Sequence, residues 1–258
     1  MSRPRRDSLL LLIAALALLP VLVNAEPLVV GFQGLDIYPY GRLDENGQYV
    51  GYMRALLDAF AADQGYELQM AAMPLKRFYL EIQGNRVDLF VPDNPGWSQE
   101  AKAGVDIHYS VPIAVALDGF AVLADAKNKG IGDGIRTIGV PLGITVEPLF
   151  DAEALAQIEF QRAARWTSVF RALRLGRVDA VYCNRSVAAQ VLSAIDMPTQ
   201  SIAWNTRLPR FKSEFHVSSE RQELIAQLNA WMNAKADVVE ALKKEYGIWA
   251  DEKVAWGD

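Results

Sequence analysis

Aromatic and amide side chains follow two short apolar segments that the sequence predicts to be β-strands. Ligands of α/β proteins bind beside the carboxyl ends of strands, so these side chains are candidates for ring stacking and amide hydrogen bonds with a small molecule. The alternative is that the tyrosines pack in a turn and the tryptophan packs in the core. The candidates are Gln33, Tyr38, Tyr40, Asp93, Asn94 and Trp97.

Two further candidates lie where helices are predicted to begin. Arg77 lies in the first turn after Pro74 and would offer a cation to a ligand, with a solvated helix charge as the alternative. Thr145 follows Gly143 at another predicted helix start, where a hydroxyl and backbone N–H groups can receive an anion or a carbonyl. Plain N-capping by Thr145 is the alternative that needs no ligand.

The residue types that carry acid–base, nucleophilic or metal chemistry do not cluster in the sequence. His108 and His216, the only histidines, lie in two segments that favour packing, and Cys183 lies in a predicted buried strand as a small apolar residue. No group of His, Cys and Asp has metal-ligand spacing, and no glycine-rich phosphate loop follows a strand. We therefore expect no enzymatic activity, no cofactor and no metal.

The first 25 residues have the form of a secretory signal peptide. Three arginines in the first six residues precede an apolar run from Leu9 to Leu19, and Val23-Asn24-Ala25 supplies the small-residue end. We expect cleavage after Ala25 and a periplasmic product, with an uncleaved anchor as the alternative. No cysteine stands at the cleavage point, which argues against a lipid anchor.

The net charge limits the macromolecules that the chain is expected to bind, and the cysteine count excludes an internal disulfide. Loss of the three arginines and one aspartate of residues 1–25 changes the formal net charge from −5 to −7. A mildly acidic chain without a basic stripe is not expected to bind nucleic acid or an anionic membrane. With a single cysteine there is no internal disulfide, so stability must come from packing. We expect a monomer.

Strand and helix patterns alternate along the chain. Strands are predicted at 28–30, 66–73, 87–91, 137–140, 158–163 and 178–183, and helices at 51–64, 74–83, 145–155, 167–175 and 219–246. Alternation at this spacing predicts crossover units, and therefore an α/β fold with mostly parallel sheets flanked by helices.

A short repeat indicates two similar halves. Residues 84–90 and 176–181 each place a glycine after an amphipathic helix and before a Val-Asp strand entry. Helix–Gly–strand junctions are common in α/β proteins, which is the alternative explanation. Asp88 and Asp179 need no ligand, because an acid at a strand entrance often accepts local backbone hydrogen bonds.

Two apolar segments, 109–124 and 201–217, are suited to cross between the halves. Two crossings predict a discontinuous first lobe, residues 26–113 and 213–258, and an inserted second lobe, residues 114–212. The ligand site is then expected in the cleft between the lobes.

From residue 28 to about 247 the chain resembles the family 3 extracellular solute-binding proteins. The likeness is carried by Tyr38-Pro39-Tyr40, Gly47 to Tyr52, Pro74 to Arg77, Gly84 to Asp88, Tyr109 to Pro112, Ile138 to Thr145 and Gly176 to Asn184. The resemblance implies the type II periplasmic-binding-protein fold, in which two hinge strands join two lobes that close on a solute.

The resemblance also implies two ionic anchors that this chain lacks. Amino-acid binders of the family hold the ligand carboxylate with an arginine, but the matching stretch, residues 97–103, offers only Lys102, which lacks the planar fork. Their acid for the ligand ammonium matches Asn184, a neutral amide. We therefore expect Asn184 to contact the ligand, and the ligand not to be an ordinary L-α-amino acid.

The function implied by the resemblance is capture of a small polar molecule for an ABC-type transporter, with a membrane permease as partner. A ligand-sensing role with a membrane sensor as partner is the first alternative. The second is an enzyme resembling the cyclohexadienyl dehydratases, which share the fold.

Overall fold

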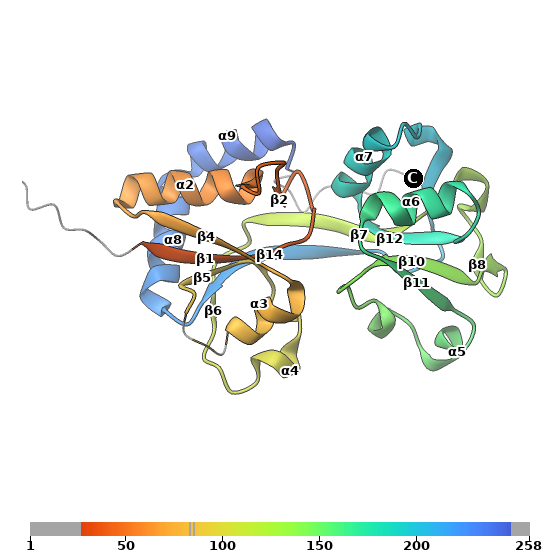
Figure 1. The fold of residues 1–258 in the computed structure, drawn as a ribbon, viewed down its shortest axis with the longest axis horizontal. Coiled ribbons are helices and arrows are strands. Elements are labelled where there is room, and N and C mark those ends of the chain that lie inside the picture. The colour runs from red at the N-terminus through yellow and green to blue at the C-terminus, as the bar shows by residue number, and fades with distance from the viewer. Residues whose placement is uncertain (1–26, 83, 85, 249–258) are drawn as a thin grey trace, which may run out of the picture.

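Two groups of parallel strands lie near the two ends of the molecule and are joined by two long antiparallel strands (Figure 1). The computed structural model describes residues 27–248 except 83 and 85. The predicted signal peptide lies outside these residues.

Both lobes have the same strand order. In the first lobe β1 (Leu28–Gln33) lies between β4 (Leu68–Met73) and β5 (Leu89–Asp93), and all three are parallel. In the second lobe β10 (Thr137–Pro141) lies between β11 (Glu159–Ala163) and β12 (Ala180–Asn184), again all parallel. The central strand comes first in the chain in each case, so the sequence repeat corresponds to a repeat of topology.

The two crossing strands form the hinge. β7 (Ala114–Leu123) pairs with β12 in the second lobe, and β14 (Phe211–Ser219) pairs with β5 in the first. Between the lobes β7 and β14 pair with each other in antiparallel register. The hydrogen-bonded ladder is therefore continuous from one lobe to the other, and β7 and β14 run through its middle (Figure 1).

Helices cover both faces of each group of strands (Figure 1). In the first lobe α2 (Tyr52–Gln64) and α9 (Ala236–Tyr246) lie on the face opposite α3 (Leu75–Glu81) and α4 (Gln99–Lys102), and α8 (Gln222–Ala234) packs against α2 and α9. In the second lobe α6 (Trp166–Arg174) and α7 (Arg185–Ala194) lie opposite α5 (Ala152–Leu155).

The remaining elements are short. The strands are β2 (Arg42–Leu43), β3 (Tyr49–Val50), β6 (His108–Tyr109), β8 (Gly130–Ile131), β9 (Gly134–Ile135) and β13 (Ile202–Trp204). Three 3₁₀ turns cover Ala124–Ala126, Glu147–Leu149 and Thr199–Ser201. None of the helices within the described ranges has the length and apolar content needed to span a membrane.

The apolar residues whose spacing predicts α2 form the face that this helix buries. Met53, Leu56, Leu57 and Phe60 are fully buried, and Gly65 ends the helix in the left-handed conformation that favours glycine. Burial of four such side chains stabilises the lobe by about 1.5–3 kcal/mol each as an upper estimate.

The helix expected over residues 145–155 is wrong. A 3₁₀ turn at Glu147–Leu149 with Pro148 near its start is followed by a separate helix, α5, whose N-cap Asp151 accepts a hydrogen bond from the Ala154 N–H. Asp151 therefore starts a new helix, and Thr145 lies outside any helix N-terminus. The other boundaries differ less: β5 begins at Leu89, α3 ends at Glu81, and the segment 219–246 forms two helices.

The paired acids of the repeat have matching structural roles. An Asp88 carboxylate oxygen accepts a hydrogen bond from the Val29 N–H at 2.8 Å, at the start of β1. An Asp179 oxygen accepts from the N–H groups of Arg136 and Thr137, at 2.9 and 2.8 Å, at the start of β10. Each acid thus fastens the third strand of its lobe to the first.

Candidate functional site

A cavity of about 760 Å³ lies between the lobes. Its walls come from the first lobe, the second lobe and both hinge strands. The side chains considered below that line it are Gln33, Tyr40, Tyr79, Trp97, Glu100, Asp118, Thr145, Trp166, Tyr182, Asn184, Phe211, Ser213 and Phe215. We call this cavity the cleft.

Five of the nine predicted site residues line the cleft: Gln33, Tyr40, Trp97, Thr145 and Asn184. Gln33 is fixed at the end of β1, where its amide nitrogen donates to the Pro92 carbonyl at 2.9 Å.

The rings of Tyr40 and Trp97 meet the same hinge residue. Their centroids lie 5.0 and 5.7 Å from that of Phe215, each edge to face. These contacts hold an aromatic wall between the first lobe and β14.

Three of the predicted site residues, Tyr38, Arg77 and Asp93, do not line the cleft and make contacts elsewhere. Tyr38 lies beneath the Arg42 guanidinium, 4.7 Å from the ring centroid, and is not among the residues that line the cleft. Arg77 extends outward with its side chain 66% exposed and pairs with Glu81 at 3.3 Å. Arg77 therefore gives the cleft no cation in this arrangement.

Asp93, the third of them, is committed to a buried ion pair. Its carboxylate lies 2.6 Å from the Lys102 ammonium and accepts a hydrogen bond from the Ser218 hydroxyl at 2.7 Å. Lys102 also donates to the Asn94 carbonyl at 2.7 Å. Because both charged groups are buried and satisfied, Lys102 is not available to hold a ligand carboxylate.

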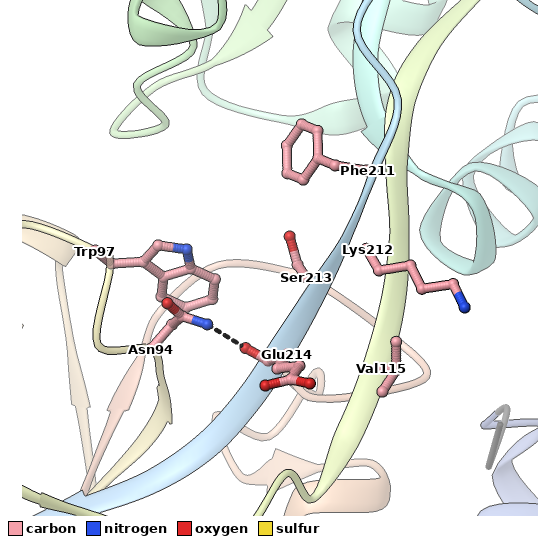
Figure 2. A pocket seen from close by; sticks show the side chains of 7 residues that line it. All are labelled: Asn94, Trp97, Val115, Phe211, Lys212, Ser213 and Glu214. Carbon is pink, nitrogen blue, oxygen red and sulfur yellow. Dashed lines mark hydrogen bonds between the residues drawn. The ribbon is translucent and has the colours of Figure 1, made fainter. Parts of the chain in front are cut away.

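Asn94 lines a second hollow of about 490 Å³ beside β14, next to the cleft. Figure 2 shows Asn94 bonded to the Glu214 carbonyl, at 2.8 Å, with Trp97, Phe211 and Ser213 nearby. The last three residues also line the cleft, so the two cavities share a wall at the hinge.

Asp118 is the cleft residue of greatest chemical interest that the sequence reasoning missed. It stands on β7 where that strand passes between its neighbours, opposite Asn184 of β12 and opposite Phe211 of β14. Its exposure is only 7%, yet it lines the cleft. A lone acid within the apolar segment 113–123 was the signal that would have identified it.

The environment of Asp118 disfavours its charge. Burial raises the pKa of its carboxyl to about 6, while the nearby polar side chains of Ser213 and Asn184 act in the opposite direction. Its negative charge in turn contributes to the raised pKa values of Tyr40, which burial and this charge bring to about 12, and of the buried Tyr182. The carboxyl and these two phenol rings all line the cleft.

Asn184 has one half of its amide engaged and the other half free of hydrogen bonds within the described chain. Its Oδ1 accepts from the N–H groups of Ser186 and Val187 at the start of α7. Its buried Nδ2 lies near enough to Asp118 to influence that pKa, but no acceptor stands within hydrogen-bond geometry. The indole N–H of Trp166 is likewise buried without an acceptor.

The histidines and the cysteine lie away from the cleft chemistry. His216 Nδ1 is 2.8 Å from the Ser110 carbonyl, and its ring packs edge to face on Tyr109. His108 is on β6, paired with the end of β14. Cys183 is fully buried, and burial raises the pKa of its thiol well above the ordinary value, which makes it unreactive.

Comparison with known proteins establishes the fold. No family model and no curated relative matches the chain. Among solved structures, an ABC uptake transporter substrate-binding protein from Streptococcus pneumoniae with bound histidine is 16% identical, with a TM-score of 0.69, over 85% of this chain and 92% of that one. The chain therefore has the two-lobed periplasmic-binding-protein fold that the sequence predicts.

Two other similar structures are a sensor domain and a second amino-acid-binding protein. A histidine kinase sensor domain is 19% identical with a TM-score of 0.69, covering 86% of this chain and 96% of that one. The ancestral amino-acid-binding protein AncCDT-1, a precursor of cyclohexadienyl dehydratase, is 21% identical with a TM-score of 0.65, covering 85% and 94%. The fold is thus shared by binding proteins, a sensor domain and a relative of an enzyme.

Proposed function

We propose that this chain is a periplasmic solute-binding protein whose lobes close on one small molecule and release it unchanged. The observation that carries the proposal is the cleft itself, because its lining comes from both lobes and from the hinge between them. A volume of about 760 Å³ is within the range of small-molecule sites. Ligand that touches both lobes only when they are closed shifts the population toward closure.

The site we propose consists of Gln33, Tyr40, Trp97, Thr145 and Asn184, to which Asp118 and the hinge residues are added. Arg77, Tyr38, Asp93 and Asn94 stay outside it, because their contacts engage them elsewhere. The lobe limits expected from the sequence, 26–113 with 213–258 and 114–212, are part of this proposal, which the crossing strands β7 and β14 support.

The test is closure on ligand binding. The chain from residue 26 onward is screened by thermal shift against a library of small metabolites, and each compound that stabilises it is then added during small-angle X-ray scattering. We expect a smaller radius of gyration with the ligand than without it. A stabilising compound that leaves the radius of gyration unchanged, or no stabilising compound in the library, contradicts the proposal.

The proposed membrane partner is a permease or a sensor. The similarity to a histidine kinase sensor domain supports the sensor as an alternative to the permease. Neighbouring genes for a permease and an ATPase favour uptake, whereas a neighbouring sensor kinase or cyclase favours signalling. The fold serves either partner, because both read the same open-to-closed change.

An enzymatic alternative follows from Asp118. A buried carboxyl with a pKa of about 6 suits a general acid, and AncCDT-1 is described as a dehydratase precursor. Mass spectrometry of ligand recovered after prolonged incubation distinguishes the two: unchanged ligand supports binding alone, and loss of water from the ligand shows a lyase.

A further inference from the structure

The charge of the cleft lining is one-sided. Two of the lining residues are acids, Asp118 in the interior and the exposed Glu100, whereas none of the described lining residues is a lysine, arginine or histidine. The nearest predicted cations are engaged elsewhere: Lys102 pairs with Asp93, and Arg77 pairs with Glu81 at the surface. Lys212 lines the adjoining hollow and not the cleft. A ligand whose main feature is a carboxylate would therefore meet no positively charged side chain in the described lining of the cleft, and one buried negative group.

Within the part of the chain that the structure describes, Asp118 forms no ion pair with a lysine, arginine or histidine, and none of these residue types lines the cleft beside it. An isolated carboxylate at 7% exposure is unfavourable unless a cation joins it. A buried acid that opens into a cavity is thus suited to receive the positive charge of a ligand.

Aromatic rings surround the same space. The lining includes Tyr40, Tyr79, Trp97, Trp166, Tyr182, Phe211 and Phe215. The faces of such rings attract ammonium groups, and the attraction is strongest where water is excluded. Tyr182 precedes Asn184 by two residues on β12 and therefore lies on the same side of that strand, and Asn184 lies directly opposite Asp118 of β7.

Two buried N–H groups in the cleft lining need a hydrogen-bond acceptor. The Nδ2 of Asn184 and the Nε1 of Trp166 belong to lining residues, are buried, and have no acceptor within the described chain. Buried donors normally have a partner, so an acceptor atom on the ligand would satisfy them.

We propose that the ligand is a small organic cation, an amine or a quaternary ammonium compound, whose nitrogen pairs with Asp118 among these rings and whose oxygen accepts from Asn184 or Trp166. The inference rests on the proposed function, because it names the class of solute that the lobes enclose. Asp118, the acid that would pair with this cation, lies on β7 directly opposite Asn184 of β12.

The test compares molecules that differ only in charge. Choline is matched with 3,3-dimethylbutan-1-ol, in which carbon replaces the charged nitrogen, and benzylamine is matched with benzyl alcohol and benzoate. Binding of each is measured by thermal shift and calorimetry with the chain from residue 26 onward. We expect binding by at least one cation, and affinity lower by about 10-fold or more for its neutral partner, as for loss of a charge-assisted bond.

The variant Asp118→Asn keeps the shape of the side chain and removes its charge. We expect it to weaken binding of the cation by about 10–100-fold. Asp237→Asn, which removes one exposed acid from α9 in the first lobe, is the charge-matched control and should leave the affinity unchanged.

The outcomes separate the two proposals. Cation binding that is retained in Asp118→Asn, or a preference for the neutral or carboxylate partner, or no binding of any cation in the set, overturns the inference about the ligand class. The proposed function survives those results if a compound of another class from the metabolite library still stabilises the chain and closes the lobes. It fails only if no compound does so.

Discussion

The buried acids Asp93 and Asp118 differ in whether a described cation pairs with them, and this difference determines their roles. Asp93 has Lys102 at 2.6 Å and Ser218 at 2.7 Å, so its charge is satisfied by the fold. Asp118 has the nearby polar side chains of Ser213 and Asn184 but no described cation. The first acid therefore stabilises the first lobe, and the second is held at a free-energy cost that a ligand can offset.

Asp118→Asn is expected to make the protein more stable at pH 7.5. The carboxyl has a pKa near 6 in the fold against an ordinary 3.8, so folding disfavours the ionised form at neutral pH. Removing that charge should raise the free energy of unfolding by about 1–3 kcal/mol. The penalty is present above about pH 6 and vanishes as pH falls below the ordinary value, so the variant and the parent should converge near pH 3.5–4. Urea unfolding at both pH values checks this, and a variant less stable than the parent at pH 7.5 contradicts it.

The affinity for an organic cation is expected to fall in mild acid. Below the pKa of about 6, Asp118 binds a proton that must leave before the cation can pair with the carboxylate. The dissociation constant should rise about tenfold for each pH unit below that value and stay constant between pH 7 and 8. Calorimetry from pH 4.5 to 8 gives the curve, and an affinity that is flat across pH 6 would exclude Asp118 as the anchor.

Lys102→Met is expected to destabilise the first lobe, in contrast to loss of the charge at Asp118. The change leaves the fully buried Asp93 carboxylate without its cation and should lower the free energy of unfolding by about 3–5 kcal/mol at pH 7.5. The double variant Lys102→Met with Asp93→Asn should recover part of this loss. Denaturant unfolding of both variants measures the effect, and equal stability of parent and Lys102→Met refutes it.

Sequence reasoning found the cleft residues that follow strand ends and missed those within the hinge. Gln33 and Asn184 lie where β1 and β12 end, and strand ends were predictable from apolar segments. Asp118 and Phe211 face the cleft because of the register in which β7 pairs with β12 and β14, which no local pattern encodes. Arg77 faces solvent because of the orientation of α3, which spacing alone does not determine.

At the scale of elements, the repeated acids make equivalent contacts in two lobes that share one strand order. Asp88 and Asp179 each precede the third strand of a lobe and accept hydrogen bonds at the start of its central strand. The sequence predicted a structural role in which each acid accepts hydrogen bonds from local backbone. The donors are instead 59 residues away for Asp88 and 42–43 residues away for Asp179. The sequence prediction failed for residues 145–155, where Pro148 and the N-cap Asp151 divide one apparent helix into two pieces.

Asp179→Asn is expected to weaken the second lobe. Although burial acts to raise it, the hydrogen bonds from Arg136 and Thr137 hold the pKa of Asp179 below its ordinary value. The stabilisation is therefore present above the ordinary pKa and is lost as pH falls through the lowered one. At pH 7.5 the change should lower the free energy of unfolding by about 1–2 kcal/mol, and below pH 3 the difference should shrink. Thermal unfolding at both pH values is the measurement, and an unchanged midpoint at pH 7.5 speaks against it.

At the scale of the molecule, ligand binding and stability are linked. A ligand at 100 times its dissociation constant adds about 2.7 kcal/mol to the free energy of unfolding, which for a protein of this size raises the melting temperature by about 5–10 °C. Calorimetric scans with increasing ligand should show one transition that moves as a whole, because the cleft joins both lobes to the hinge. Two transitions, of which only one moves, would show that the ligand holds a single lobe.

The position of Asp118 on a hinge strand has a consequence for the timing of capture. A residue close to an axis of rotation moves little when the outer parts rotate, so under the proposed closure Asp118 keeps nearly the same position on β7 while the walls around it move. Arrival is then governed by long-range attraction and slows as salt is added, whereas departure waits for the walls to part. Encounter and residence are thereby set by different parts of one molecule, and each can change in evolution without disturbing the other.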